Sequence, residues 1–254
     1  MILLIDAGNT RIKWRIVAGG ALCAAGVSPT ADAAGLNAAW RPFALTRAVL
    51  SCVADAALQA DLIDRLTARG VSVQRLVAER ERYGVINRYE FPEKLGADRY
   101  AALIAAARLQ LDDCVVASIG TATTLDWLDR NREFRGGVIL PGPDLMRGAL
   151  LGGTRQIESR MQDDVDPGNF AAAGFFPPRT TNSAVSGGIH LAQVGAIQAF
   201  CAAVQAETGT RPQLLLTGGA RARLLPGLHM ELIEIEDLVL EGLAWIARET
   251  ACAN

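Results

Sequence analysis

The fold follows from one stretch near the start of the chain, Asp6-Ala-Gly-Asn-Thr-Arg-Ile-Lys13. The apolar run Met1-Ile-Leu-Leu-Ile5 precedes it, as expected of a strand that is buried on both faces. Residues 11–16 alternate basic and apolar side chains, and this period of two predicts a second strand with its basic side chains on one face. The chain therefore opens with a strand, a tight turn at Gly8 and another strand.

The same pattern returns near the middle of the chain. A buried strand at Cys114–Ala117 leads into Ser118-Ile-Gly-Thr-Ala-Thr-Thr-Leu-Asp126, whose Gly120 aligns with Gly8. Each copy is an apolar strand, a polar turn centred on glycine and a second strand. This repetition predicts a duplicated, two-lobed α/β fold with mixed sheets.

The remaining periodicities fill the two lobes, which we place at residues 1–112 and 113–254. Apolar residues at helical spacing predict helices, and short apolar runs bounded by turn residues predict strands. The expected helices are 55–69, 94–111 and 180–206, and the expected strands are 47–54, 71–77, 136–143 and a run that starts at Leu214.

The overall composition excludes several classes of function. The 254 residues carry a net charge of −2 without a basic excess, so nucleic acid is not an expected partner. Five cysteines without C-x-x-C spacing and two histidines predict neither a disulfide framework, nor a structural zinc site, nor a Ser-His-Asp triad. Acidic small substrates remain possible because a few local cations suffice to bind them.

The hydropathy pattern favours a cytoplasmic protein. Met1-Ile-Leu-Leu-Ile leads directly to Asp6, and these residues lack the basic n-region that a signal peptide has. Residues 180–206 carry no charged side chain and are long enough to span a bilayer, but several Asn, Ser, His and Gln residues interrupt them. We expect a buried helix of a soluble protein there, and no membrane association.

The first turn has the composition of a phosphate cradle. Gly8 lets the backbone approach a ligand, Asn9 and Thr10 add side-chain donors, and Lys13 adds a positive charge. Asp6 ends a buried strand and suits a magnesium ion held through water. An ordinary hairpin turn explains the same residues equally well. Because the Walker and G-x-G-x-x-G patterns are absent, a phosphate site here must be of the hairpin type.

Two further glycine turns could serve the same nucleotide. The hydroxyl groups of Thr121, Thr123 and Thr124 could contact phosphates, although threonine is also common in plain strands. The glycines of Thr217-Gly-Gly219 could clear space for a nucleoside, although a strand-to-helix turn explains them as well.

The element Gly96-Ala-Asp-Arg99 opens the predicted alanine-rich helix. Asp98 could accept the proton of a substrate hydroxyl that attacks a γ-phosphate, and Arg99 could pair with a substrate carboxylate. The alternative is that Asp98 only caps the helix. Thr181 starts the uncharged segment, where its hydroxyl could reach a ligand or help to cap that helix.

Taken in order, these segments resemble the type III pantothenate kinase family, which belongs to the acetate/sugar kinase–Hsp70–actin class with its actin-like, ribonuclease H-like fold. The resemblance spans nearly the whole chain. It rests on Asp6–Lys13, Gly96–Arg99, Gly120-Thr-Ala122, Gly136-Gly-Val-Ile-Leu-Pro-Gly142, Thr181 three residues before Ala184, and Thr217–Gly219.

The resemblance implies an ATP-dependent kinase that converts pantothenate to 4'-phosphopantothenate, the first step of coenzyme A biosynthesis. It implies a homodimer with sites at its interface and Asp98 as the proton acceptor. By this resemblance, ATP is bound by Asp6, Ala7, Gly8, Asn9, Thr10, Arg11, Ile12, Lys13 and Thr121. Pantothenate is bound by Tyr89, Gly96, Ala97, Asp98, Arg99 and, across the dimer interface, Thr181.

One position departs from the family pattern. The family commonly has an acidic residue where this chain has Ser118, and that residue binds a monovalent cation, K⁺ or NH₄⁺. The nearby Asp126 could compensate, because the hydroxyl of Ser118 is a weaker cation ligand than a carboxylate.

Two alternatives remain open at this point: a kinase of the same fold class that acts on another hydroxyl or carboxylate, and a non-catalytic relative that binds nucleotide. The uncharged segment and the Phe175-Phe176 loop indicate an apolar surface that a second copy would cover.

Overall fold

The computed structural model describes residues 1–153 and 177–252, which form two compact units. Unit 1 comprises residues 1–110, 131–135 and 237–254, and unit 2 comprises residues 111–130 and 136–236. Unit 2 begins at residue 111, close to the lobe boundary that the sequence predicts after residue 112. Residues 131–135 and the C-terminal helix, however, cluster with unit 1, whereas the sequence pattern placed them in the second lobe.

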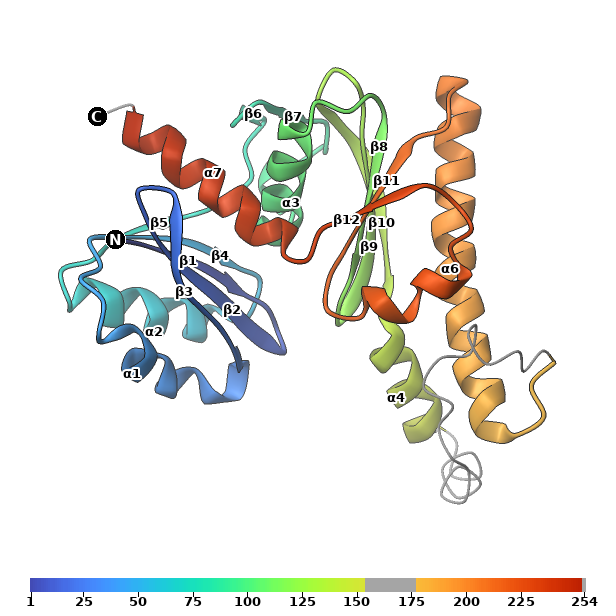
Figure 1. Ribbon diagram of the computed structural model, residues 1–254, viewed down its shortest axis with the longest axis horizontal. Helices are drawn as coiled ribbons and strands as arrows, with labels where there is room; N and C mark the ends of the chain where they lie inside the picture. The colour runs from blue at the N-terminus through green and yellow to red at the C-terminus, as the bar shows by residue number, and fades with distance from the viewer. Residues whose placement is uncertain (154–176, 253–254) are drawn as a thin grey trace. The chain divides into compact units, whose positions relative to one another are not determined.

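Unit 1 is built around a five-stranded mixed sheet with the order β3-β2-β1-β4-β5 (Figure 1). β1 is antiparallel to β2 and parallel to β4. The strands are β1 (Ile2–Ala7), β2 (Arg11–Ala18), β3 (Ala21–Pro29), β4 (Arg47–Cys52) and β5 (Ser72–Arg75). Two short strands, β6 (Glu81–Arg82) and β7 (Val85–Asn87), form an antiparallel ribbon that is not part of this sheet.

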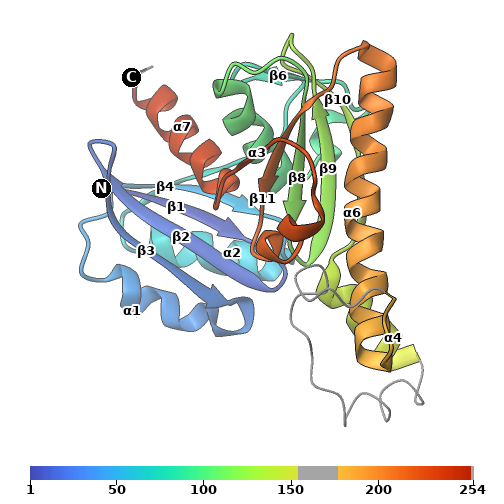
Figure 2. The same cartoon turned by 45° about the vertical axis from the view of Figure 1, so that its right-hand side comes forward.

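Helices cover both faces of this sheet, as Figures 1 and 2 show. α1 and α2 supply Leu36, Trp40, Leu62 and Leu66 to a core on one face, and α3 and α7 lie against the other face. The helices are α1 (Leu36–Trp40), α2 (Ala56–Thr67), α3 (Ala97–Arg108) and α7 (Leu238–Cys252), with single 3₁₀ segments at Thr30–Gly35 and Pro92–Lys94.

The alternation in β2 is confirmed by its burial. Ile12, Trp14 and Ile16 are buried in the core, while Lys13 and Arg15 lie on the other face and are partly exposed. A buried apolar face and a basic face are therefore fixed by one short strand. The basic face is turned toward the side of the sheet that α7 covers, because Lys13 and Arg15 both pair with residues of the α7 region.

Unit 2 repeats the topology of unit 1. Its strands lie in the order β12-β11-β8-β9-β10 within a seven-stranded sheet that continues through β7 and β6, and β8 is antiparallel to β9 and parallel to β11. β8 thus takes the place of β1, and β9 that of β2, so the predicted internal duplication extends to the pairing of the strands. The elements are β8 (Cys114–Ile119), β9 (Ala122–Leu128), β10 (Glu133–Pro141), α4 (Pro143–Gly153), α6 (Thr181–Thr208), β11 (Gln213–Thr217), β12 (Leu232–Glu234), and 3₁₀ segments at Arg221–Arg223 and Leu225–Gly227.

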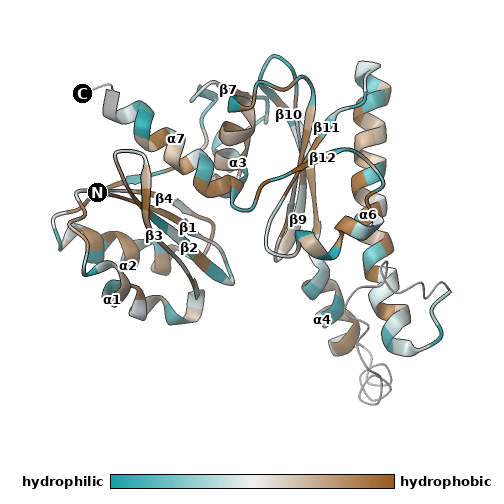
Figure 3. Cartoon of the chain, viewed as in Figure 1, coloured by the Kyte–Doolittle hydropathy of each residue, from teal (hydrophilic) through white to brown (hydrophobic). Residues whose placement is uncertain are grey.

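α6 is the long helix that the sequence predicts from the uncharged segment 180–206, and it extends two residues farther. Its length and mean hydropathy of 1.3 would suit a membrane span, but 44% of its most apolar window is buried within the molecule. Gln193 is fully buried and accepts a hydrogen bond from Thr123 Oγ1 (2.6 Å) while donating to the carbonyl of Pro141 (2.8 Å). Apolar and polar residues alternate along the helix (Figure 3). α6 is accordingly bound to the sheet of unit 2 by polar as well as apolar contacts.

Candidate active site

The first glycine turn is a short, internally bonded hairpin loop. The Gly8 N–H donates to the carbonyl of Arg11 (3.0 Å), and a Cβ at Gly8 would lie 3.2 Å from that oxygen. Thr30 holds the other side, because its hydroxyl donates to Gly8 O (2.9 Å) and its N–H to Thr10 O (3.0 Å). Asn9 is exposed at the tip. The sequence predicts that the backbone at Gly8 approaches a ligand, but the Gly8 N–H itself is used inside the turn.

The two apolar members of the predicted ATP-binding stretch have no exposed surface. Ala7 and Ile12 are both 0% exposed and belong to the core beneath the sheet. Thr10 and Arg11, like Asn9, are exposed. Any contact of this stretch with a ligand is thus made by the loop 8–11, by Asp6 and by Lys13, while Ala7 and Ile12 hold the hairpin in place.

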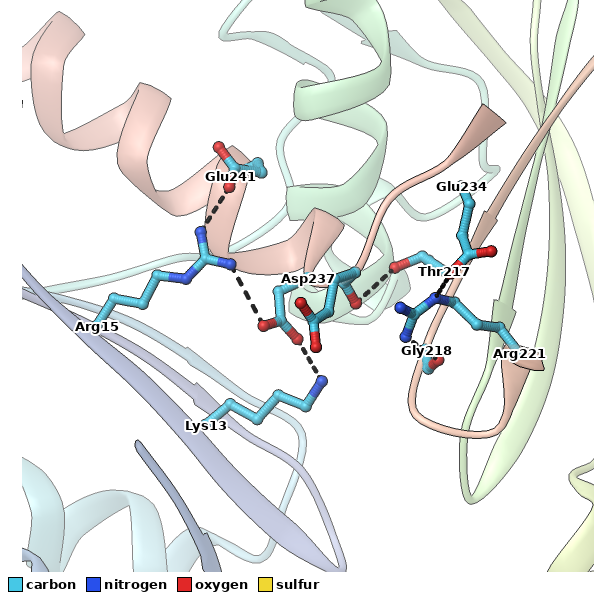
Figure 4. Close-up of polar contacts among 9 residues, drawn as sticks. Lys13, Arg15, Thr217, Gly218, Arg221, Glu234, Asp237 and Glu241 are labelled. Carbon is cyan, nitrogen blue, oxygen red and sulfur yellow. Dashed lines mark hydrogen bonds and ion pairs between the residues drawn. The ribbon is translucent and has the colours of Figure 1, made fainter. Parts of the chain in front are cut away.

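Lys13 is held by a carboxylate that the sequence reasoning did not identify. Its ammonium group forms an ion pair with Asp237, the residue immediately before α7. The same carboxylate accepts from Arg15 Nη2 (3.3 Å), and Arg15 Nη1 pairs with Glu241 Oε1 at 2.5 Å. Figure 4 shows the Asp237 carboxylate lying between the two cationic side chains. These contacts join β2 to the first turn of α7 within unit 1.

Asp6 lies at the end of β1 in an environment that opposes its ionisation. The pKa of its carboxyl group is raised from 3.8 to about 7, chiefly by burial and also by the negative charges of Asp98 and Asp237, while the positive charge of Lys13 opposes the rise. Two further carboxylates, Asp98 and Asp237, and the ammonium group of Lys13 thus act on Asp6 within unit 1. A cation near Asp6 would relieve this concentration of negative charge.

Asp98 occupies the first turn of α3, where Gly96 is the N-cap residue. Its Oδ1 accepts a hydrogen bond from the Arg99 N–H (2.8 Å), and a Cβ on Gly96 would lie 2.7 Å from that same oxygen. Glycine at the cap thus leaves room for the carboxylate to lie over the helix start. Burial raises the pKa of Asp98, and the Arg99 N–H and guanidinium oppose that rise. A raised pKa makes this carboxylate a better proton acceptor.

Arg99 and Tyr89 meet beside this helix start. The guanidinium of Arg99, a residue only 7% exposed, donates to Tyr89 Oη (3.0 Å) and lies 5.6 Å from the centre of the Tyr89 ring. Phe134 packs against both, with its ring 5.1 Å from that of Tyr89 and 5.7 Å from the guanidinium carbon. The Tyr89 backbone is fixed by Asn87 and Arg80. Of the predicted substrate residues, Tyr89, Gly96, Ala97, Asp98 and Arg99 are therefore placed by unit 1.

Thr121, Ser118 and Thr181 belong to unit 2. The turn at Gly120-Thr121 is enclosed by two glycines that come from distant motifs. A Cβ at Gly142 would lie 2.1 Å from Gly120 O, and a Cβ at Gly218 would lie 2.3 Å from Ile119 O. Gly218 also has a φ of +95°, which favours glycine. The motifs around residues 142 and 218 are thus parts of one structure, in which small residues let three backbone segments meet at the end of β8.

Ser118 shares one face of the unit 2 sheet with three other oxygen-bearing side chains. It is paired in register with Thr124 and Thr217, and Asp126 lies one pleat farther along β9, opposite Val116. Because side chains alternate along a strand, these residues lie on the face opposite that of Val115, Ala117 and Leu125, which pack with α6. Thr124 Oγ1 is buried without a hydrogen-bond partner among the described residues. The face therefore offers several oxygen atoms to a cation.

Thr181 is the first residue of α6. The N-cap residue is Thr180, which forms a capping box with Ser183, so capping does not require the Thr181 hydroxyl. Arg147 of α4 donates to Asn182 Oδ1 (3.1 Å) and Ser186 Oγ (3.3 Å) one turn along. Thr181 is only partly buried at this helix start. Phe175 and Phe176 lie outside the described residues.

Sequence reasoning missed Asp237 and Phe134. The apolar spacing of Leu240, Leu243 and Ile246 could have indicated a helix that begins just after Asp237, since an aspartate is common at such a start. Nothing in the sequence pairs that residue with Lys13, because 224 positions separate them. Phe134 had no motif around it that would have distinguished it from any core aromatic residue.

Comparison with known proteins identifies the family. The family model for type III pantothenate kinase matches residues 2–203. A type III pantothenate kinase of Aromatoleum aromaticum is 43% identical over 255 residues and covers 100% of both chains. One of Azoarcus sp. is also 43% identical, and the match covers 99% of this chain and 92% of the relative.

Solved structures agree on the fold. A structure from Sinorhizobium meliloti that carries the name of a 2-dehydro-3-deoxygalactonokinase has a TM-score of 0.60 at 16% identity, with 98% of this chain and 99% of that chain covered. One from Campylobacter jejuni that carries the name of a Baf family transcriptional activator has a TM-score of 0.59 at 20% identity, with the same coverage. At such identities the likeness concerns the fold alone, which is the α/β fold of the actin-like sugar kinases with mixed sheets. Because the family model spans most of the chain and the curated relatives match along its length, the protein is a kinase of the type III pantothenate kinase family.

Proposed function

We propose that this protein catalyses the ATP-dependent phosphorylation of pantothenate to 4'-phosphopantothenate, the first step of coenzyme A biosynthesis. The observation that carries the proposal is the start of α3, where a partly buried carboxylate of raised pKa, Asp98, adjoins a buried guanidinium, Arg99. Such a pair suits a substrate that has both a hydroxyl to be activated and a carboxylate to be bound. Pantothenate has both groups, and the curated relatives are named for it.

The proposed reaction is a direct transfer of the γ-phosphoryl group. The carboxylate of Asp98 accepts the proton of the primary hydroxyl while that oxygen forms a bond to the γ-phosphorus of ATP. The bond from the γ-phosphorus to the β–γ bridging oxygen breaks, and ADP leaves with the electron pair. Most of the catalytic effect in such a transfer comes from positioning and charge stabilisation, and the base orients the nucleophile.

Magnesium fits the carboxylates at the end of β1. In kinases this ion is usually bound by one or two carboxylates together with substrate phosphates and water. We propose that Asp6 holds it through water, because burial and the charges of Asp98 and Asp237 raise the pKa of this carboxyl group to about 7, and a divalent cation would offset them. When bound with the nucleotide, the ion would neutralise charge on the β- and γ-phosphates.

The remaining site residues follow from the family resemblance and the local geometry. For ATP we propose the loop 8–11 with Asp6 and Lys13, supported by Ala7 and Ile12, and Thr121 in unit 2. For pantothenate we propose Tyr89, Gly96, Ala97 and Arg99. Burial and the hydrogen bond from Arg99 to Tyr89 leave the guanidinium preorganised for a carboxylate.

A coupled assay of ADP formation tests the proposed function. The purified protein should release ADP with ATP, Mg²⁺ and pantothenate, and the product should be 4'-phosphopantothenate by mass spectrometry. Turnover only with another hydroxyl or carboxylate substrate would instead indicate a different kinase of the same fold class. Nucleotide binding without any turnover would indicate a non-catalytic relative.

A monovalent cation is the second proposed cofactor. We propose that K⁺ or NH₄⁺ binds the unit 2 face that carries Ser118, Thr124 and Asp126, and that the Asp126 carboxylate provides the charge that Ser118 lacks. Turnover should therefore rise when Na⁺ is replaced by K⁺ at constant ionic strength. Asp126→Asn should remove that stimulation, whereas an equal rate in Na⁺ and K⁺ for the unaltered protein would contradict the proposal.

A homodimer is supported by apolar side chains on unit 2. Large hydrophobic residues are 38–62% exposed on β10, α4 and α6, where a monomer would leave them in water: Val138, Ile139, Leu145, Leu150 and Leu191. We propose that a second copy covers them and that Thr181 contacts the substrate bound by the other copy. Sedimentation should give a dimer, and Ile139→Glu should shift it toward a monomer with a lower kcat/KM for pantothenate. A fully active monomer would contradict this proposal.

The protein is further proposed to be cytoplasmic, without nucleic-acid or membrane partners.

A further inference from the structure

We infer that Asp237 is a positioning residue for phosphoryl transfer: its carboxylate holds the ammonium group of Lys13, and the guanidinium of Arg15, in one arrangement at the start of α7. The inference rests on the proposed function in one respect, namely that Lys13 contacts the phosphates of ATP. It adds a residue from the far end of the chain to the phosphate-binding hairpin.

The contacts are specific to this carboxylate. Asp237 Oδ1 pairs with Lys13 Nζ, and Asp237 Oδ2 accepts from Arg15 Nη2 at 3.3 Å, so each oxygen serves one cation (Figure 4). The side chains of Lys13 and Asp237 are only 24% and 19% exposed. Glu241, one turn along α7, pairs with Arg15 but makes no contact with Lys13 among the interactions in Figure 4. Asp237 therefore holds Lys13 directly, and Glu241 does not.

The support behind Asp237 is rigid. Its carbonyl accepts from the Glu241 N–H (3.1 Å), which fixes it to the first turn of α7. α7 packs closely on α3, because a Cβ on Gly242 would lie only 2.0 Å from Ala101 O. Leu243 and Ile246 are fully buried in the same helix. α3 carries Asp98 at its own start, so the residue that holds Lys13 and the proposed base are set by one pair of packed helices.

A lysine in a phosphate site gains from such a partner. Its side chain has four rotatable bonds and a point charge, so an unpaired lysine samples many positions. The ammonium group has three N–H donors and no acceptor. One donor directed to Asp237 leaves the others for phosphate oxygens, and the side chain no longer has to be ordered when the nucleotide binds.

A double-mutant cycle tests this role. Asp237→Asn should lower kcat about tenfold, since misplacement of a group by about 1 Å can reduce rates by up to roughly 10², while the KM for pantothenate stays unchanged. In a Lys13→Ala background the same change should have no further effect on kcat. Asp237→Glu should recover part of the lost rate. Thermal unfolding of every variant verifies that it folds. If Asp237→Asn alone is unstable, the double variant, which lacks both charges of the pair, can still be compared with Lys13→Ala.

Glu241→Gln is the matched control, because it removes a carboxylate that pairs with Arg15 and, within residues 1–153 and 177–252, with no other cation, and it should keep kcat within about twofold. An equal loss in Glu241→Gln would mean that the effect acts through Arg15, and a tenfold loss that multiplies with Lys13→Ala would mean that Asp237 acts elsewhere. A normal kcat in Asp237→Asn would also overturn the inference. If the unaltered protein fails to turn over ATP with pantothenate, the proposed function itself fails, so the two failures are distinguishable.

Discussion

Replacing Asp98 with asparagine is expected to lower kcat by a factor of about 10²–10⁴, the usual contribution of a general base. Asparagine has nearly the same size, and its side-chain oxygen can still accept the Arg99 N–H that Asp98 Oδ1 accepts at 2.8 Å. The amide cannot take up the proton of the substrate hydroxyl. The loss should therefore fall on turnover, while the affinity for ATP, measured by titration of the folded variant, changes little.

The fold should tolerate this substitution. Burial raises the pKa of Asp98, so the ionised carboxylate is less stable here than in water, and a neutral side chain removes that penalty. Asp55→Asn is a suitable control because Asp55 is the N-cap of α2, accepts the Leu58 N–H at 2.7 Å and is exposed. Both variants keep a helix-start hydrogen bond, but only Asp98→Asn should lose turnover. If kcat of Asp98→Asn stays near normal, Asp98 is a structural residue of the helix start.

The sequence predicts well what is encoded locally. The alternation of residues 11–16, the apolar run before Asp6 and the glycine at position 120 each belong to one strand or turn, and the two strand–turn–strand elements are confirmed as β1–β2 and β8–β9. The start of α3 is also local, since Gly96 and Asp98 are two residues apart. Its observed limits, Ala97–Arg108, are shorter than the predicted 94–111 because Pro92–Lys94 form a separate 3₁₀ segment.

What the sequence could not provide is the meeting of distant segments. Lys13 and Asp237 are 224 residues apart, and their pairing depends on α7 returning to the face of β2 that carries the basic residues. From the sequence, Gly142 only lies near the end of the strand expected at residues 136–143, and Gly218 suits a nucleoside site or a strand-to-helix turn, but the structure shows that both glycines allow the close approach of the turn after β8. In each case a small or charged residue is explained by a partner that no periodicity in the chain identifies.

The tertiary contacts also change how one sequence-level assignment is understood. Lys13 lies on the predicted face of β2, yet its ammonium group is not fully solvated, because it forms an ion pair with Asp237. The Gly8 N–H, expected to face a ligand, closes the turn on Arg11 O. These contacts within the protein fix the hairpin before any nucleotide binds. The exposed loop 8–11, Asp6 and Lys13 are the parts of the hairpin that can contact a nucleotide.

Replacing Asp6 with asparagine is expected to raise the stability of the protein above neutral pH while lowering turnover. The carboxyl group of Asp6 has a pKa of about 7 in the folded protein, against 3.8 for the unperturbed group. Between these values the unfolded chain releases the proton and the folded chain keeps it, so the group contributes stability at low pH that is lost as the pH rises through the folded pKa. The full difference corresponds to at most about 4 kcal/mol in the free energy of unfolding.

Asparagine has no charge to place in this environment, so the stability of Asp6→Asn should not carry that pH dependence. The difference from the unaltered protein, measured by urea unfolding without nucleotide or magnesium, should be largest at pH 8 and should shrink toward pH 5. Asp61→Asn provides the control: Asp61 forms a partly exposed i,i+4 pair with Arg65, and exposed pairs contribute little. A difference that is constant from pH 5 to 8 would mean that Asp6 does not titrate in this range.

The loss of turnover in Asp6→Asn has the same physical origin as the gain in stability. Burial and the nearby negative charges of Asp98 and Asp237 disfavour the ionised carboxylate of Asp6, and a bound cation would offset this effect. With Mg²⁺ and ATP the unaltered protein should be stabilised strongly and turn over, whereas Asp6→Asn should gain less from Mg²⁺ and lose about 10²-fold or more in kcat, since a bound metal ion supplies several kcal/mol of transition-state stabilisation. A variant that is both more stable at pH 8 and fully active would show that Asp6 does not hold the metal. If the stability rises and turnover falls together, the Asp6 carboxylate, whose ionisation is disfavoured at the end of β1, helps to bind the magnesium–nucleotide complex.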